Sequence, residues 1–353
     1  MKLSNNQQAF LELVKAGLWE KDARLLPYGN IDFQEIYRLA QEQAVIGLVA
    51  AGFEHVVDVK IPQVWALQFA GQTIQLEQRN RAMNQFIADL VAKMRKADIC
   101  TLLVKGQGIA QCYERPLWRS SGDIDFLLSV DNYNKAIAFL KERYTNNKNG
   151  GNYSKENAFY TDQWMIEVHG TLRTCLASKI DKAIDDVQRD VFFGSHVRSW
   201  NNGGTTVFLP AVSEDVILVF THFIKHFYKE GGVTLRQLCD WCRLLWKYQS
   251  TVKLDFLKTR LKKAGLISEW RAFAALAVDY LGLPNDSMPL YSQEKKWSDK
   301  AELILEFILK GGEWRKLHDT VVVGKIFPVS TLRFLPGIIL NVNWLKIKER
   351  LFS

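Results

Sequence analysis

The feature that most constrains the fold of this 353-residue chain is a change of hydrophobic period near residue 97 that reverses near residue 213. Before the first change, apolar residues recur at intervals of three and four, which is the spacing of one helix face. Between the two changes, short apolar runs alternate with helical stretches. A chain of this length holds more than one packed unit. We therefore expect an α+β protein with an N-terminal helical region (1–96), a core built on a small mixed β-sheet (97–212), a C-terminal helical region (213–310) and a basic tail (311–353).

The core region contains several short strand candidates separated by turn residues. A buried strand at 99–105 leads into a short helix that begins at glycine, and a second strand at 122–130 leads into a helix opened by Asp131. After the turn-rich sequence NNKNGG, two further strands are expected to form an antiparallel pair. Asn201-Asn202-Gly203-Gly204 joins the clearest hairpin candidate, because asparagine and glycine suit hairpin turns. The strands of the pair and of the hairpin are expected at residues 156–162, 163–172, 196–200 and 205–210.

The helical regions carry start signals. Residues 30–32 (Asn, Ile, Asp) precede a helical pattern, and Asn or Asp can accept a backbone N–H bond ahead of the first turn. Ser213, followed by two acids, is expected to cap the next helix. After residue 310 the sequence predicts irregular structure with one short helix near residues 344–352.

The charge of the chain limits its possible binding partners, and its cysteine content limits the cellular compartment in which we expect it. The formal net charge of +8 favours anionic partners without choosing among nucleotides, nucleic acid and phosphate-bearing surfaces, and only the segment after Gly311 is locally basic, with seven Lys or Arg against three acids. Five cysteines without a framework spacing predict a reducing compartment and no structural disulfide, and the C-x-x-C of residues 239–242 is interpreted as helix packing. The sequence has no secretory pattern and no run of about 18 apolar residues. We expect a cytoplasmic protein without a membrane span.

Asp123 and Asp125 are the strongest candidates for chemistry. They are two residues apart on an expected strand, so both carboxylates leave one face while Ile124 and Phe126 point to the other. Acids within an apolar strand need neutralising, and Mg²⁺ takes oxygen ligands of this kind. The alternative for a single D-x-D sequence is a strand edge whose acids face water.

Three neighbouring features favour the metal-binding interpretation. Lys105-Gly106-Gln107-Gly108 follows one strand and begins a helix, whose free N–H groups and positive dipole end bind phosphate. Glu167 lies on a strand that can run beside the aspartates, where a third carboxylate could complete a metal site or accept a proton from an attacking hydroxyl. The loop just before the aspartates offers further phosphate donors in Arg119, Ser120 and Ser121.

Several segments, taken in their order along the chain, resemble the nucleotidyltransferase superfamily of the polymerase-β type. KGQGIA, a tyrosine at 113, an arginine-containing loop, SGDIDFLL, a helix and IEVHGTL follow one another, and the nearest branch is that of bacterial uncharacterised nucleotidyltransferases with helical regions on both sides. The similarity covers most of residues 30–250. It implies that Asp123 and Asp125 hold the metal ions, that Glu167 is the third acid, and that Gly106 marks the phosphate-facing turn.

The resemblance further implies transfer of a nucleoside monophosphate from a nucleoside triphosphate to an acceptor hydroxyl. Two Mg²⁺ (or Mn²⁺) ions about 3.5–4 Å apart would clamp the attacking and leaving oxygens, while Lys105, Arg119 and Ser121 would neutralise the phosphates. The acceptor stays open: a small molecule, a protein or RNA. The alternative is a non-catalytic nucleotide- or nucleic-acid-binding module, because Gln107 stands where the superfamily usually has serine or glycine.

Three further positions have both functional and structural interpretations. His169 follows the third acid by two residues and could orient substrate, assist proton movement or make a structural hydrogen bond. His222 and His226 have the i, i+4 spacing of a zinc pair, but no third ligand is evident, so core or groove-lining histidines are the favoured interpretation. A position bordering the acceptor site stays open for both. Arg236 is a candidate substrate contact, with a surface salt bridge as its alternative.

Overall fold

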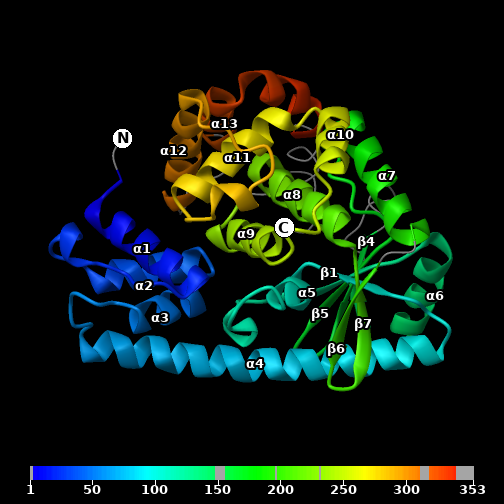
Figure 1. Cartoon of the computed structure of the whole chain (residues 1–353). Coiled ribbons are helices and arrows are strands. Elements are labelled where there is room, and N and C mark those ends of the chain that lie inside the picture. Colours follow the sequence, from blue (N-terminus) through cyan, green and yellow to red (C-terminus); the bar gives the residue numbers. More distant parts are fainter. Residues whose placement is uncertain (1–2, 148–155, 195–196, 230–231, 311–317, 339–353) are drawn as a thin grey trace, which may run out of the picture.

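One mixed β-sheet lies between two groups of helices in the computed structural model, and the long helix α4 runs beneath both the sheet and the N-terminal helices (Figure 1). Helices of the C-terminal half cover the opposite side. The α+β class expected from the sequence is therefore confirmed. The structure describes residues 3–147, 156–194, 197–229, 232–310 and 318–338.

The N-terminal region is helical, as the apolar spacing predicts. Asp32 caps the second helix, since its carboxylate accepts the backbone N–H groups of Gln34 and Glu35, so the start signal at residues 30–32 is confirmed. The elements are α1 (Asn5–Trp19), the short 3₁₀ helix η1 (Leu26–Tyr28), α2 (Phe33–Glu42), α3 (Ile46–Glu54) and α4 (Gln63–Lys96).

Helices α1 and α3 cross with their backbones in contact, and glycines permit this approach. A Cβ atom on Gly17 of α1 would lie 1.9 Å from the carbonyl oxygen of Leu48, and one on Gly52 of α3 would lie 2.2 Å from that of Leu13. Rotating a side chain cannot relieve such distances, because the opposing atoms belong to the backbone. The two helices would have to move apart to accept a larger residue.

Gly17→Ala is therefore expected to lower the free energy of unfolding by roughly 1–3 kcal/mol through overpacking. Gly71→Ala is the matched control, because a Cβ at Gly71 on α4 meets no atom within 4 Å. Alanine is the better helix former, so the control should gain about 0.5–1 kcal/mol. Urea denaturation measures both changes, and equal effects would contradict the close contact of α1 with α3.

Within the described residues, the sheet has seven strands in the order β3-β4-β5-β2-β1-β7-β6. β2 pairs in parallel with β5 and antiparallel with β1, and β1 lies parallel to β7. The predicted antiparallel pair is β4 with β5 and the predicted hairpin is β6 with β7, so both are confirmed. The sequence pattern does not predict β3, a three-residue edge strand that includes Asn146 and Asn147, so the turn expected at these two residues is wrong. The bounds are Leu102–Val104 (β1), Asp123–Leu127 (β2), Thr145–Asn147 (β3), Glu156–Tyr160 (β4), Met165–His169 (β5), Arg198–Asn202 (β6) and Thr205–Leu209 (β7).

The two faces of the sheet differ because side chains alternate along each strand. Ile124 and Phe126 of β2 are buried in a core that α4 and α6 complete. Asp123 and Asp125 leave the opposite face and line a cavity there, as their spacing predicts.

The remaining helices lie around the sheet and in the C-terminal half. Within the described residues, none of the helices combines the length and the apolar sequence needed to cross a bilayer. They are α5 (Gly106–Ala110), η2 (Pro116–Trp118), α6 (Val130–Lys141), α7 (Ser178–Phe193), α8 (Val212–Lys229), α9 (Leu235–Lys247), α10 (Leu254–Ala264), α11 (Ile267–Asp279), η3 (Asn285–Ser287), α12 (Lys295–Leu309) and α13 (His318–Ile326).

Several helix boundaries differ from the expectations. α6 begins one residue before Asp131. α8 begins at Val212, so Ser213 lies inside its first turn, where its hydroxyl accepts the backbone N–H of Lys253 instead of capping the helix. The pattern between β5 and β6 does not predict α7, which packs against α8 and α10.

The irregular structure expected after residue 310 is wrong for residues 318–326 and 328–338, which are helical. Phe327, Phe334 and Ile338 are buried in the main core, so tertiary packing stabilises a segment that local sequence does not identify as helical. The helix expected at 344–352 lies outside the described residues.

Candidate active site

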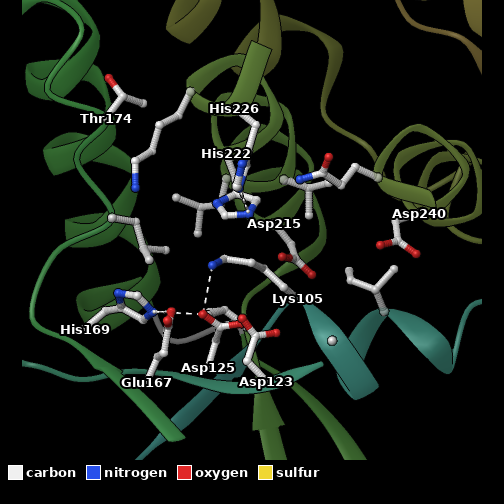
Figure 2. A pocket seen from close by; sticks show the side chains of 18 of the residues that line it. Lys105, Asp123, Asp125, Glu167, His169, Thr174, Asp215, His222, His226 and Asp240 are labelled. Carbon is white, nitrogen blue, oxygen red and sulfur yellow. Dashed lines mark hydrogen bonds and ion pairs between the residues drawn. The ribbon is translucent and has the colours of Figure 1, made fainter. Parts of the chain in front are cut away.

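Acidic side chains meet on the cavity face of the sheet, where β2 and β5 lie side by side. The strands run parallel with Asp125 opposite Glu167, so β5 does lie beside β2 as predicted. Neighbouring strands are about 5 Å apart, and this register alone brings the two carboxylates together. Figure 2 shows Asp123, Asp125 and Glu167 grouped below Lys105. These three acids form the floor of the site.

His169 and Lys105 contact the floor directly. The Nε2 atom of His169 lies 2.9 Å from Oδ1 of Asp125 and 3.4 Å from Oε2 of Glu167. The ammonium of Lys105 lies 2.8 Å from the same oxygen of Asp125. Ligand atoms of Asp125, Glu167 and His169 all lie within 4.8 Å of one another, a spacing at which they could hold a metal ion. Asp123 lines the same cavity and adds a further carboxylate.

The charges of this cluster do not balance. Repulsion by Asp125, together with burial, raises the pKa of Asp123 above its ordinary value. Burial opposes ionisation of Asp125, but Lys105 and His169 outweigh burial and hold its pKa below the usual range. Burial also opposes ionisation of His169 and so lowers its pKa, but hydrogen bonds to Asp125 and Glu167 outweigh burial and raise the pKa to about 8. A divalent cation would relieve the repulsion that remains between the two aspartates.

The turn from β1 into α5 is strained at Lys105, whose φ of 57° and ψ of −147° are rare for any residue but glycine. Gly106 follows with a φ of 41°. The turn lies against β2, since a Cβ on Gly106 would be 3.5 Å from the carbonyl oxygen of Asp123. Strain of this kind persists where surrounding contacts fix the backbone, and the ion pair of Lys105 with Asp125 is one of them.

A buried ion pair holds the loop that precedes β2. Arg119 binds Asp240 of α9 through two hydrogen bonds, 2.7 Å from Nε to Oδ1 and 2.6 Å from Nη2 to Oδ2. Its Nη1 donates to the hydroxyl of Ser121 and the carbonyl of Ser120. Arg119 lines the cavity, whereas the two serines do not. The guanidinium of Arg119 is therefore already occupied by hydrogen bonds to other groups of the protein.

Gln107 is buried and contacts α4 instead of lining the cavity. Its amide nitrogen donates to Oδ1 of Asn80 at 2.8 Å and to the hydroxyl of Ser121 at 3.3 Å. Asn80 in turn donates to the carbonyl groups of Leu117 and Arg119. Helix α4 thus holds both the start of α5 and the loop before β2.

A cavity of about 480 Å³ lies over the floor, with α8 and α9 on its far side. His222 and His226 line it from α8, with their Nε2 atoms 3.0 Å apart, and burial lowers the pKa of His222 well below its usual value. Arg236 lines it from α9 and donates to the carbonyl of Ser120. The Nε of Arg236 is buried and has no hydrogen-bond partner among the described residues.

The cavity includes residues that the sequence interpretation missed. The basic ones on α8 had a detectable signal, because positions 222, 225, 226 and 229 recur at helical intervals. No local pattern identifies Asp240, since its partner Arg119 is 121 residues away. The missed lining residues include Arg173, Thr174, Cys175, Asp215, Lys225, Lys229 and Asp240.

The C-x-x-C of residues 239–242 lies inside α9. Cys239 and Cys242 are free and buried, and burial raises the pKa of both thiols. Buried thiols with raised pKa values are unreactive, which agrees with the packing interpretation.

Comparison with protein families supplies one further observation about the same region. A family described as uncharacterised nucleotidyltransferase matches residues 29–282, a span that contains the floor, α8 and α9. No curated protein and no solved structure matches the chain.

Proposed function

We propose that this chain, which belongs to the uncharacterised nucleotidyltransferase family, moves a nucleoside monophosphate from a nucleoside triphosphate to an acceptor hydroxyl. The observation that carries the proposal is the register of β2 and β5, which sets Asp125 opposite Glu167, with Asp123 in the same cavity. Three carboxylates so placed on adjacent strands suit phosphoryl-group chemistry.

The floor residues fit a divalent cation. Asp123, Asp125 and Glu167 offer the oxygen ligands that hard cations prefer, and the raised pKa of Asp123 reflects a repulsion that added positive charge relieves. His169 is a further candidate ligand from the same cluster. When bound, two Mg²⁺ or Mn²⁺ ions would supply neutralisation of phosphate charge and a lower pKa for the attacking hydroxyl.

The chain's own residues bind and orient the reactants. Lys105 attracts the phosphate oxygens, and the guanidinium of Arg236, which lines the same cavity, is a second donor to them. The acceptor oxygen bonds to the α-phosphorus as the bond to the bridging oxygen breaks, and pyrophosphate leaves. Glu167 accepts the proton that the hydroxyl loses. Gly106 leads the phosphate-facing turn, while Gln107, Arg119, Ser120 and Ser121 act as positioning residues of the turn and its neighbouring loop.

The alternatives from the sequence have less support. Gln107, which favours a non-catalytic binding module, contacts Asn80 and does not line the cavity, so its identity does not argue against catalysis. The pair His222 and His226 acquires no third ligand for zinc within the part of the chain that the structure describes.

Added Mg²⁺ or Mn²⁺ should stabilise the protein, because an ion that binds only the native state raises the free energy of unfolding, by about 2.7 kcal/mol at 100 times its dissociation constant. Glu167→Gln keeps the side-chain volume but removes a charged ligand, so most of this gain should be lost. Thermal unfolding with and without the ion measures the effect. Glu142→Gln, at an exposed residue, is the control, and an undiminished gain in Glu167→Gln would contradict the metal assignment.

Transfer itself can be tested with nucleoside triphosphates labelled at the α-phosphate, incubated with the protein, Mg²⁺ and an extract of the producing cells. One labelled acceptor should appear, with release of pyrophosphate, only when the ion is present. All five cysteines are free and two are exposed, which supports the reducing cytoplasm as the source of the acceptor. Calorimetric binding of nucleotide without transfer from any of the four triphosphates would instead support a binding module.

A further inference from the structure

One face of α8 presents four basic side chains to the cavity. His222, Lys225, His226 and Lys229 are spaced as neighbours on one helix face, and we call them the α8 stripe. All four line the cavity and are partly exposed, whereas the residues between them, such as Phe223, are buried. Helix α8, most of whose other residues are buried, therefore places two ammonium groups and two imidazoles over the site.

The basic surface continues onto the loop after β5. The ammonium of Lys229 lies 3.1 Å from the carbonyl oxygen of Cys175, which ties this loop to α8. Arg173 of the same loop also lines the cavity and pairs with Asp185 at the surface. Arg173, Lys225 and Lys229 thus give one end of the cavity a concentration of positive charge.

This basic end is separate from the end proposed for the triphosphate. Figure 2 shows Thr174 and Asp240 at opposite sides of the cavity. Arg236 shares α9 with Asp240, so it belongs to the other end. At 1.5 Å per residue, Lys229 lies about 10 Å along α8 from His222, which stands over Lys105. A nucleotide bound by Lys105 and Arg236 therefore leaves the basic end for the second substrate.

We propose that the α8 stripe and Arg173 bind a phosphate or carboxylate group of the acceptor, which is therefore a small anionic molecule. This rests on the proposed function, because it assigns the second substrate of the same site. Ammonium and guanidinium groups bind such oxyanions through charge-assisted hydrogen bonds, and the histidine N–H groups add donors. A cavity of about 480 Å³ has the size of a small-molecule site. An acceptor anchored there directs its hydroxyl toward Glu167 on the floor.

The test is a calorimetric titration of the full chain, saturated with Mg²⁺ and an α,β-methylene triphosphate analogue, with inorganic phosphate and with acetate. Tighter binding of phosphate indicates a phosphate-bearing acceptor, and tighter binding of acetate a carboxylate-bearing one. Lys225→Glu should weaken the preferred probe by at least about tenfold, since it replaces an attractive charge with a repulsive one. The affinity for the nucleotide analogue should change by less than about threefold, because its phosphates lie at the other end.

Lys262→Glu is the matched control, because Lys262 is exposed on α10 and does not line the cavity. Failure of both probes to bind the saturated parent would overturn the proposal. An equal loss of nucleotide affinity in Lys225→Glu would also overturn it, since the α8 stripe would then hold the triphosphate. If the analogue does not bind the parent, the proposed function fails. Titration of phosphate and acetate into the nucleotide-free parent and into Lys225→Glu then still tests whether the α8 stripe binds an oxyanion. Thermal unfolding verifies each variant, and Lys229→Gln carries the comparison if Lys225→Glu does not fold.

Discussion

Replacing Asp123 and Asp125 together with asparagine is expected to reduce nucleotidyl transfer at least about 10³-fold, because the anionic ligands of the floor are lost while the cavity keeps its shape. Loss of the Asp125 carboxylate, which lies 2.8 Å from the Lys105 ammonium in the parent, would also leave that ammonium without its ion-pair partner. Transfer is measured as labelled nucleoside monophosphate incorporated at saturating triphosphate and Mg²⁺. Stabilisation by the ion should disappear in the same variant.

Asp162→Asn provides the control for this experiment, since Asp162 is exposed in the turn between β4 and β5 and its substitution removes a negative charge outside the cavity. Its transfer rate should stay within about twofold of the parent rate, because an exposed charge outside the site is largely screened. Transfer at parental rate by the double variant would mean that the chemistry takes place elsewhere on the chain, and the role assigned to the floor would be withdrawn.

The second large effect is on stability. Asp240→Ala is expected to lower the free energy of unfolding by about 3–5 kcal/mol, because it leaves the charge of Arg119 buried without compensation. The Arg119 side chain is only 4% exposed, so water cannot replace the missing carboxylate. Tyr113 would lose the acceptor that its hydroxyl reaches at 2.8 Å. Urea denaturation, followed by circular dichroism, measures the change.

Asp299→Ala is the comparison, because Asp299 forms an exposed ion pair with Lys295 and such pairs contribute about 0–1 kcal/mol. Arg119→Met combined with Asp240→Leu should recover most of the stability lost in Asp240→Ala, since apolar residues of similar size can replace a buried pair. A cost below about 1 kcal/mol for Asp240→Ala would show that the pair is not buried in solution. Transfer should fall in the double variant even when it folds, because Arg119 no longer holds the loop before β2.

The acidic floor can be predicted from sequence because the steps that lead to it are mostly local. Alternation along a strand decides that Asp123 and Asp125 share a face opposite Ile124 and Phe126. His169 follows Glu167 by two residues, so recognising β5 already places both side chains on one face. The parallel pairing of β5 with β2 is the step that periodicity cannot supply, since register depends on the whole sheet.

The roles of Gln107 and Arg119 could not be predicted in the same way. Beside a glycine-led helix and an aspartate pair, their side chains suggest phosphate donors. Their partners Asn80 and Asp240 lie 27 and 121 residues away, and no local pattern relates them. The helices between residues 318 and 338 escape prediction for the same reason, because their stability comes from apolar residues packed against distant parts of the chain.

The 34 residues of α4 span about 50 Å and connect the N-terminal helices to the underside of the sheet. A truncated protein starting at residue 97 would keep every acid of the floor but lose Asn80, along with Met83 and Ile87 of the core beneath β2. Truncation inside α4 would expose the remaining apolar face of the helix to water. The minimal fragment that catalyses transfer should therefore begin upstream of α4. The sheet without this helix is too small a unit for expression or engineering.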